Sequence, residues 1–190
     1  MNEAVFLFVH LIFIHKQSMD KRLEYADKIS LERIEKLHPA IRKEVKEAYL
    51  DINMSLPKGV RLRISQGLRT ISEQDALYAQ GRSNEGKIVT QARGGDSWHN
   101  WSLAFDFVLL YDKDKNGTLE TASWNENKYW MQVVKGFKAK GFEWGGDWRF
   151  KDSPHFQKVF GLTISQAKAR MKAGDVIRDN GITYININKI

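Results

Sequence analysis

One acidic residue interrupts an apolar run typical of a buried β-strand, LAFDFVLL at residues 103–110. Side chains of a strand alternate between two faces, so Asp106 shares a face with Ala104 and lies opposite Phe105 and Phe107. A carboxylate in such a strand is costly unless it is paired, hydrogen-bonded or bound to a metal. The face that carries Asp106 is therefore expected to meet a cation.

Local patterns around this strand predict a small α+β domain. Apolar residues recur at helical spacing over residues 30–53 and are interrupted by the His-Pro pair at 38–39, which predicts two short helices. Apolar and basic residues alternate over residues 60–64, as in a half-buried strand, and further strands are expected at 142–144 and 182–187.

Three capping-box patterns predict helix starts, because the two side chains of such a box satisfy each other's free backbone amides. The patterns are Thr70-x-x-Glu73, Ser123-x-x-Glu126 and Thr163-x-x-Gln166, and the glycines expected to stop the three helices are Gly81, Gly141 and Gly174.

The composition fits one folded domain, which we expect over residues 19–190. The chain has 190 residues, of which 42% are hydrophobic and 28% charged, enough for a packed core and unlike a disordered chain. Cysteine is absent, which excludes disulfides, thiolate zinc sites and a cysteine nucleophile. A transition metal would be bound by His, Asp or Glu. The net charge of +7 favours polyanionic partners such as nucleic acid or an anionic cell wall.

Residues 1–18 form an apolar N-terminal segment whose role is open between a signal, an anchor and an extension. The run MNEAVFLFVHLIFI is shorter than the ~20 residues of a spanning helix. It carries Glu3 and no Lys or Arg before the apolar stretch, and no clear cleavage site follows. A membrane partner is expected only if this segment acts as a signal or anchor.

Two histidines lie in polar and aromatic surroundings, His99 in Ser-Trp-His and His155 in Ser-Pro-His. Together with Asp106 they would supply three ligands, and a catalytic zinc site needs three protein ligands plus a position open to water and substrate. Taken singly, each residue also fits an ordinary hydrogen-bonded role, with Asp106 paired to an Arg.

The order of three motifs resembles the M15 metallopeptidases, a family of D-Ala-D-Ala carboxypeptidases, dipeptidases and L-alanyl-D-glutamate endolysins. SWHNWSLAFD at residues 97–106 is similar to the signature S-x-H-x-x-G-x-A-x-D. WGGDW at 144–148 with DSPHF at 152–156 resembles the second motif, and SQGLR at 65–69 with Glu-Gln at 73–74 resembles the substrate-side segment.

The resemblance implies zinc on His99, Asp106 and His155, on a small antiparallel sheet with helices packed around it. It also implies Asp152 as the catalytic base and Arg69 near the substrate carbonyl, where its donor fork suits an oxyanion. A surface Arg at a helix start is the alternative for Arg69.

One position departs from the family pattern, because Ser102 stands where the signature has Gly. If that residue is left-handed, Ser strains the turn by ~1 kcal/mol or more, and no ligand is lost.

Three further residues are candidates for substrate binding: Gln66, Ser97 and Trp144. The tryptophans that flank the motifs could wall a groove for sugar or peptide, although core packing is the commoner use of aromatic residues. Ser97 could orient His99 or its loop, or serve only as a turn residue.

Residues 112–120 resemble the first part of a calcium loop, with oxygen donors on Asp112, Asp114 and Asn116 and Gly117 at the sharp turn. The twelfth position is Ser123 in place of the bidentate Glu. A solvated turn is therefore the favoured interpretation, with Ca²⁺ as a side hypothesis.

The resulting prediction is a zinc metallopeptidase that acts on the stem peptide of peptidoglycan in the bacterial cell wall, after export or release at lysis. An L-alanyl-D-glutamate endopeptidase of endolysin type leads, and a D-alanyl-D-alanine carboxypeptidase is the alternative. A non-catalytic cell-wall-binding module is the alternative of another class. Nucleic acid is not expected as a partner, because the basic residues are scattered and form no known module.

Overall fold

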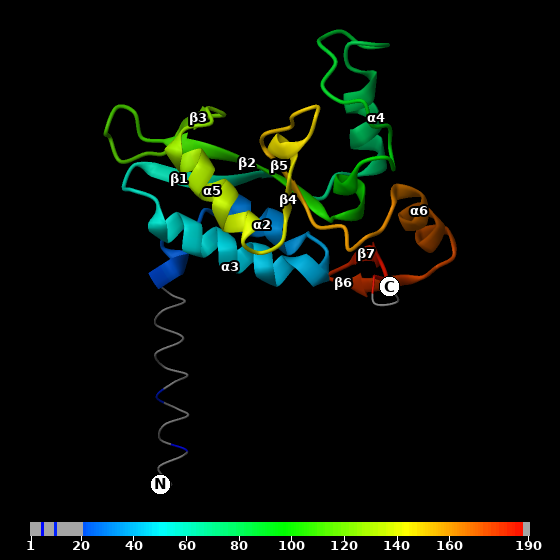
Figure 1. The fold of residues 1–190 in the computed structure, drawn as a ribbon, viewed down its shortest axis with the longest axis horizontal. Coiled ribbons are helices and arrows are strands. Elements are labelled where there is room, and N and C mark those ends of the chain that lie inside the picture. The colour runs from blue at the N-terminus through cyan, green and yellow to red at the C-terminus, as the bar shows by residue number, and fades with distance from the viewer. Residues whose placement is uncertain (1–4, 6–9, 11–20, 188–190) are drawn as a thin grey trace.

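The computed structural model describes residues 21–187, together with Val5 and His10 (Figure 1). Apart from those two residues, the N-terminal segment predicted at 1–18 lies outside the described residues. Among the described helices, none combines the length and apolar character that crossing a membrane requires.

Helices and strands follow each other in mixed order along the chain. They are α2 (Lys28–Glu35), α3 (Pro39–Ser55), β1 (Val60–Gln66), α4 (Ile71–Ala79), the 3-10 turn η1 (Trp98–Trp101), β2 (Ala104–Tyr111), β3 (Thr121–Ser123), α5 (Lys128–Lys138), β4 (Glu143–Trp144), η2 (Gly145–Asp147), β5 (His155–Gln157), α6 (Ile164–Lys172), β6 (Val176–Asp179) and β7 (Ile182–Ile185).

An antiparallel sheet forms the centre of the fold, with strand order β1-β2-β5-β4 and β3 paired to the far end of β2. A separate two-stranded ribbon, β6-β7, lies near the C-terminal end of the described chain beside α6 (Figure 1). Helices α2, α3 and α5 pack against the sheet and one another. The α+β prediction with a small antiparallel sheet is therefore confirmed.

One face of the sheet is the hydrophobic core, as the alternation around Asp106 predicts. Phe105 and Phe107 are fully buried on this face. The Phe105 ring lies 4.8 Å from that of Phe137 on α5, and the Phe107 ring lies 4.1 Å from that of Trp130. Aromatic pairs at such distances add about 0.5–1.5 kcal/mol beyond the area that they bury. Asp106, which lies between Phe105 and Phe107 on β2, therefore points to the opposite face of the sheet.

The predicted helix signals are largely confirmed. The break at His38-Pro39 separates α2 from α3, with His38 as the N-cap, although α3 is longer than expected at 17 residues. Complete capping boxes begin α4 at Thr70 and α6 at Thr163. Glycines at positive φ follow the helix ends within three residues, at Gly81, Gly141 and Gly174.

The capping box predicted at Ser123 is wrong, because Ser123 ends strand β3 and the helix starts later. Asn127 caps α5 instead, and its Oδ1 accepts the backbone N–H groups of Tyr129 and Trp130 at 2.9 and 3.2 Å. An Asn side chain next to the helix fills the role that the more distant Ser was expected to play.

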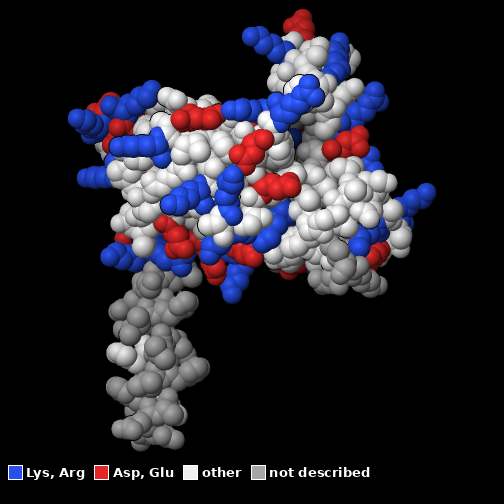
Figure 2. All heavy atoms as spheres, viewed as in Figure 1, with Lys and Arg blue, Asp and Glu red and all other residues white. Residues whose placement is uncertain are grey.

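Charged residues of both signs are mixed over the face shown in Figure 2. Several of the basic side chains form ion pairs, such as Arg22 with Asp51 at 2.8 Å and Lys158 with Glu44 at 2.6 Å. On this face the positive excess is spread and does not form a single stripe.

Candidate metal centre

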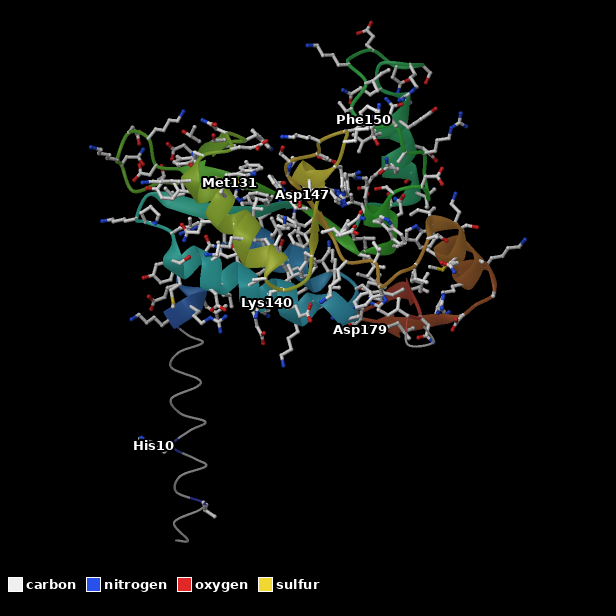
Figure 3. The ribbon with its side chains drawn as sticks, viewed as in Figure 1. His10, Met131, Lys140, Asp147, Phe150 and Asp179 are labelled. Atoms are coloured by element: carbon white, nitrogen blue, oxygen red, sulfur yellow. The ribbon has the colours of Figure 1, made fainter. Side chains whose placement is uncertain are left out.

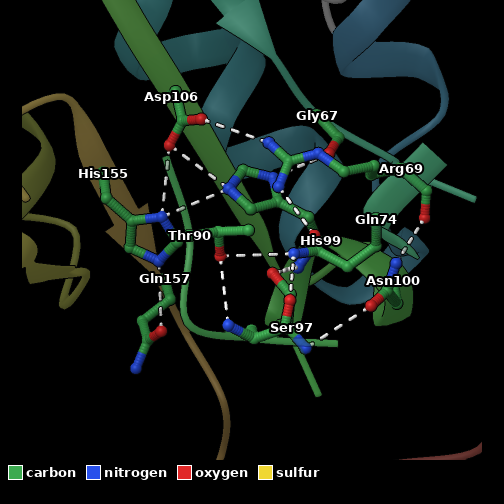
Figure 4. Close-up of polar contacts among 11 residues, drawn as sticks. Gly67, Arg69, Gln74, Thr90, Ser97, His99, Asn100, Asp106, His155 and Gln157 are labelled. Carbon is green, nitrogen blue, oxygen red and sulfur yellow. Dashed lines mark hydrogen bonds and ion pairs between the residues drawn. The ribbon is translucent and has the colours of Figure 1, made fainter. Parts of the chain in front are cut away.

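Strand pairing brings Asp106 and His155 side by side on the face of the sheet opposite the core. In the antiparallel register of β2 with β5, Asp106 is directly opposite His155 and Phe105 is opposite Phe156. His99 arrives from η1, the turn that leads into β2, and its ring completes a cluster of three side chains (Figure 4). Both histidines are buried, and Asp106 is partly buried.

Three donor atoms in this cluster form a nearly equilateral triangle. His99 Nε2 lies 3.2 Å from His155 Nδ1 and 3.2 Å from Asp106 Oδ1, and His155 Nδ1 lies 3.1 Å from Asp106 Oδ1. Tetrahedral zinc with bonds of about 2.0–2.1 Å separates its N and O ligands by about 3.3 Å. The triangle therefore has the size that a zinc ion requires.

The outer ring nitrogens of both histidines face hydrogen-bond acceptors. His99 Nδ1 lies 2.8 Å from the carbonyl oxygen of Gly67, and His155 Nε2 lies 3.2 Å from Oε1 of Gln157. Because those oxygens only accept, each of these ring nitrogens carries the proton, so a neutral imidazole turns a lone pair toward Asp106. Three lone pairs then converge, which only a cation or a shared proton can stabilise.

Electrostatics in the cluster favour a positive occupant. Burial by itself would raise the pKa of Asp106, but His99 and His155 beside it hold that pKa well below its usual range. Burial would likewise lower the pKa of His155, yet the hydrogen bond and charge of Asp106 raise it above the ordinary value. The centre thus keeps its carboxylate ionised and attracts positive charge.

Arg69 lies at the edge of the cluster, held by a buried amide. Its Nη1 donates to Oε1 of Gln74 at 2.8 Å, and its Nη2 is 3.7 Å from Oδ2 of Asp106. Gln74 is fully buried on α4 and donates in turn to the carbonyl oxygen of Ala92 at 2.8 Å. The guanidinium is therefore held between the amide of Gln74 and the carboxylate of Asp106.

A cleft of about 520 Å³ opens over the cluster and contains the three ligands, Arg69 and Asp152 among its lining residues. Residues 89–92 line it on the α4 side, and Trp148 lines it on the side of the β4–β5 connection. Phe150, 82% exposed, lies on that same connection (Figure 3). Partial burial raises the pKa of the Asp152 carboxyl, and the nearby charge of Asp106 adds to this.

Comparison with known proteins finds a family and two curated proteins that part of this chain resembles. A family model of the M15 peptidases, described as D-alanyl-D-alanine carboxypeptidase, matches residues 90–158. The chain is 46% identical over 110 residues to the peptidoglycan L-alanyl-D-glutamate endopeptidase CwlK of Bacillus subtilis (strain 168). This aligned region covers 54% of this chain and 63% of the relative. It is 28% identical over 150 residues to the L-alanyl-D-glutamate peptidase of Listeria phage A118, covering 73% and 48% of the two chains.

Over these segments the chain is similar to the M15 peptidases. The matched segment contains His99, Asp106, Asp152 and His155, whereas Arg69 precedes it. The chain spans less than two thirds of the length of either relative.

The M15-like residues predicted to bind substrate lie in different environments. Ser97 lines the cleft, and its Oγ accepts the backbone N–H of His99 at 3.4 Å as the cap of η1. Trp144 is 8% exposed within the core, and its indole N–H donates to the carbonyl oxygen of Ser153 at 2.7 Å. Gln66 pairs with Asp106 beside a bulge in β1. Neither Trp144 nor Gln66 is among the residues that line the cleft.

The calcium-like loop uses its oxygens to hold its own backbone. Asp112 Oδ2 accepts the N–H of Gly117 at 3.0 Å, Asp114 Oδ1 accepts that of Asn116 at 3.2 Å, and Asn116 Oδ1 accepts that of Thr118 at 2.7 Å. Among the described residues, the one His, Asp and Glu cluster with metal-binding geometry is the triad at β2 and β5. The favoured interpretation as a solvated turn agrees with these contacts, and the Ca²⁺ hypothesis stays a prediction.

The sequence analysis did not identify the two groups that contact the outer ring nitrogens of His99 and His155. The carbonyl oxygen of Gly67 carries no side-chain signal. Gln157 does carry one, because it lies two residues after His155 and therefore on the same face of a strand.

Ser102 adopts the conformation that the family Gly would favour, with φ 59° and ψ 21°. Its backbone N–H closes η1 on the carbonyl oxygen of His99 at 3.3 Å, directly before β2. The strain predicted for this position is therefore present where the chain passes from one ligand to the next.

We expect Ser102→Gly to raise the free energy of unfolding by up to about 1 kcal/mol, since glycine adopts the left-handed region without a Cβ clash. Urea denaturation of both proteins measures the difference. Ser72→Gly, at a right-handed position in α4, is the control and should lower stability. A loss of stability in Ser102→Gly would contradict the strain.

Proposed function

We propose that the chain is a zinc-dependent peptidase that hydrolyses a peptide bond in the stem peptide of bacterial peptidoglycan. The observation that carries this proposal is the triangle of lone pairs from His99, Asp106 and His155, with edges of 3.1–3.2 Å, at the floor of a cleft. Similarity to the M15 peptidases supports hydrolysis over the function of a binding module. On this proposal, residues 19–190 form the peptidase domain and act in the cell wall.

The bond that we propose is the one between L-alanine and D-glutamate. The support is the names of the two relatives, both of which cleave at that pair. The alternative, a D-alanyl-D-alanine carboxypeptidase, is supported by the description of the family model.

Zinc on His99, Asp106 and His155 would polarise the scissile carbonyl and lower the pKa of a bound water toward ~7. Arg69 provides the second positive group at the carbonyl. Its Nη2 lies 3.7 Å from Asp106 Oδ2, and it is held by Gln74, so that it can donate to the oxygen on which negative charge develops.

Asp152 is the general base in this proposal. Its carboxylate takes a proton from the attacking water as the new C–O bond forms, and delivers that proton to the leaving amine as the C–N bond breaks. The backbone of Asp152 is fixed, because its N–H donates to the carbonyl oxygen of Gly145 at 3.0 Å and its own carbonyl accepts the N–H of His155 at 3.0 Å. The backbone that carries the Asp152 side chain is therefore joined to the backbone of His155.

We expect about one zinc ion per chain, and the loss of both zinc and wall-lytic activity in His99→Ala, Asp106→Ala and His155→Ala. A site with three protein ligands cannot spare one. Metal analysis of purified proteins and turbidity loss of cell-wall suspensions measure the two properties. Full activity after exhaustive treatment with EDTA would exclude the zinc mechanism.

We expect digestion of purified peptidoglycan to release peptides that begin with D-glutamate, because cleavage after L-alanine frees that amine. Mass spectrometry of the soluble products identifies them. Free D-alanine in their place would assign the carboxypeptidase alternative, and intact peptidoglycan with wall-bound protein would assign the binding module.

Asp152→Asn is expected to lower the rate of hydrolysis by about 10²–10⁴ while zinc stays bound, because the amide cannot take the proton. Asp147→Asn is the matched control in the same connection. Its carboxylate forms an exposed ion pair with Lys138 on α5 at 2.6 Å, so the rate should change little. The assignment fails if Asp147→Asn loses turnover with zinc intact while Asp152→Asn keeps it.

A further inference from the structure

A row of three polar side chains runs outward from the candidate metal centre along β5 and β4. His155 and Gln157 lie two residues apart on β5, and Gln157 is directly opposite Glu143 in the register of β4 with β5. His155 Nε2 lies 3.2 Å from Gln157 Oε1, and Gln157 Nε2 donates to Glu143 Oε2 at 2.6 Å. All three side chains therefore share the face of the sheet that carries Asp106.

The carboxylate of Glu143 determines which way the amide of Gln157 points. An ionised carboxylate only accepts hydrogen bonds, so the NH₂ group of Gln157 must face it. The opposite orientation would place two acceptor oxygens 2.6 Å apart. The amide oxygen is thereby left toward His155, whose Nε2 must carry a proton to donate to it.

We propose that Gln157, oriented by Glu143, is a positioning residue that presents Nδ1 of His155 to the metal. This inference rests on the proposed zinc site. With its proton held at Nε2, the neutral ring keeps a lone pair at Nδ1, 3.1 Å from Asp106 Oδ1. Contacts of this kind orient the ligand and raise its basicity.

His155 needs this support more than His99 does. The outer nitrogen of His99 donates to a backbone carbonyl, that of Gly67, which is fixed by the fold. The outer nitrogen of His155 faces only a side chain, and that side chain is oriented by an exposed carboxylate. Trp148 lies against the His155 ring, with the ring centres 5.2 Å apart, and supplies no hydrogen bond to it. The amide of Gln157 therefore selects the tautomer of His155.

Zinc affinity tests the role without relying on activity. Gln157→Leu is expected to raise the zinc dissociation constant by about 10–100-fold, measured by competition with a chromogenic chelator. Gln132→Leu is the matched control, because it removes a Gln that makes two hydrogen bonds to Ser55, between α5 and α3. Its zinc affinity should equal that of the wild type. Thermal unfolding of the metal-free variants checks that each one folds.

An exchange of the two outer residues separates positioning from packing. In Glu143→Gln/Gln157→Glu, the new carboxylate accepts from His155 and from the new amide, so zinc affinity should return to within a few-fold of the wild type. Affinity as weak as that of Gln157→Leu in a folded exchange variant would overturn the role, as would unchanged affinity in Gln157→Leu. Failure of the wild-type chain to bind zinc would instead overturn the proposed function.

Discussion

The pairing of β2 with β5 is the constraint on which the rest of the site depends. It places Asp106 opposite His155 on one face, and in the same step Phe105 opposite Phe156 on the other. A shift of β5 by one residue against β2 would turn Phe156 out of the core and His155 into it. The free energy of burying the aromatic face therefore also holds the two ligands in register, and His99 follows because η1 leads directly into β2.

If His99, Asp106 and His155 bind a metal as proposed, metal binding and folding depend on each other. Their donor atoms converge within 3.2 Å, and two of the three side chains are buried, so without a cation they either repel one another or share a proton. A ligand that binds only the folded state stabilises it in proportion to the logarithm of its concentration over its dissociation constant. Strand pairing already joins β2 to β5 at this point. A bound zinc ion would in addition connect η1 to both strands through His99.

Much of the fold could be predicted because its signals are local. The alternation around Asp106, the break at His38-Pro39 and the capping boxes at Thr70 and Thr163 each depend on a few neighbouring residues. The capping box predicted at Ser123 was wrong because such a pattern is also local. It does not reveal that Ser123 pairs with Leu109 of β2 as part of strand β3. Strand β4 (Glu143–Trp144) lies within the strand predicted at residues 142–144, whereas the three-residue strands β3 and β5 were not predicted, because strands this short depend on their partners.

The sequence indicated the residues that line the candidate site, but not the groups that form hydrogen bonds with its histidines. Motifs in a fixed order indicated the three ligands, Asp152 and Arg69, all of which line one cleft. Trp144 belongs to one of those motifs but lies in the core. A motif does not indicate on which face of its strand a side chain lies, so the sequence could not exclude this residue from the site. The carbonyl oxygen of Gly67, which faces His99, has no signal in the sequence, whereas Gln157 has one in its spacing of two residues from His155.

One wall of the cleft is a sheet and the other an irregular segment, and Gln74 joins them. The ligand wall is part of the sheet. The opposite wall, at residues 89–92, is an irregular segment in which Val89 is 55% exposed. Gln74 binds Arg69 through its oxygen and Ala92 through its nitrogen, so one buried amide connects the guanidinium at the metal ligands with the exposed wall. If Arg69 has the role proposed above, a substrate that displaces this wall also changes the orientation of the guanidinium, and with it the charge presented to the scissile carbonyl.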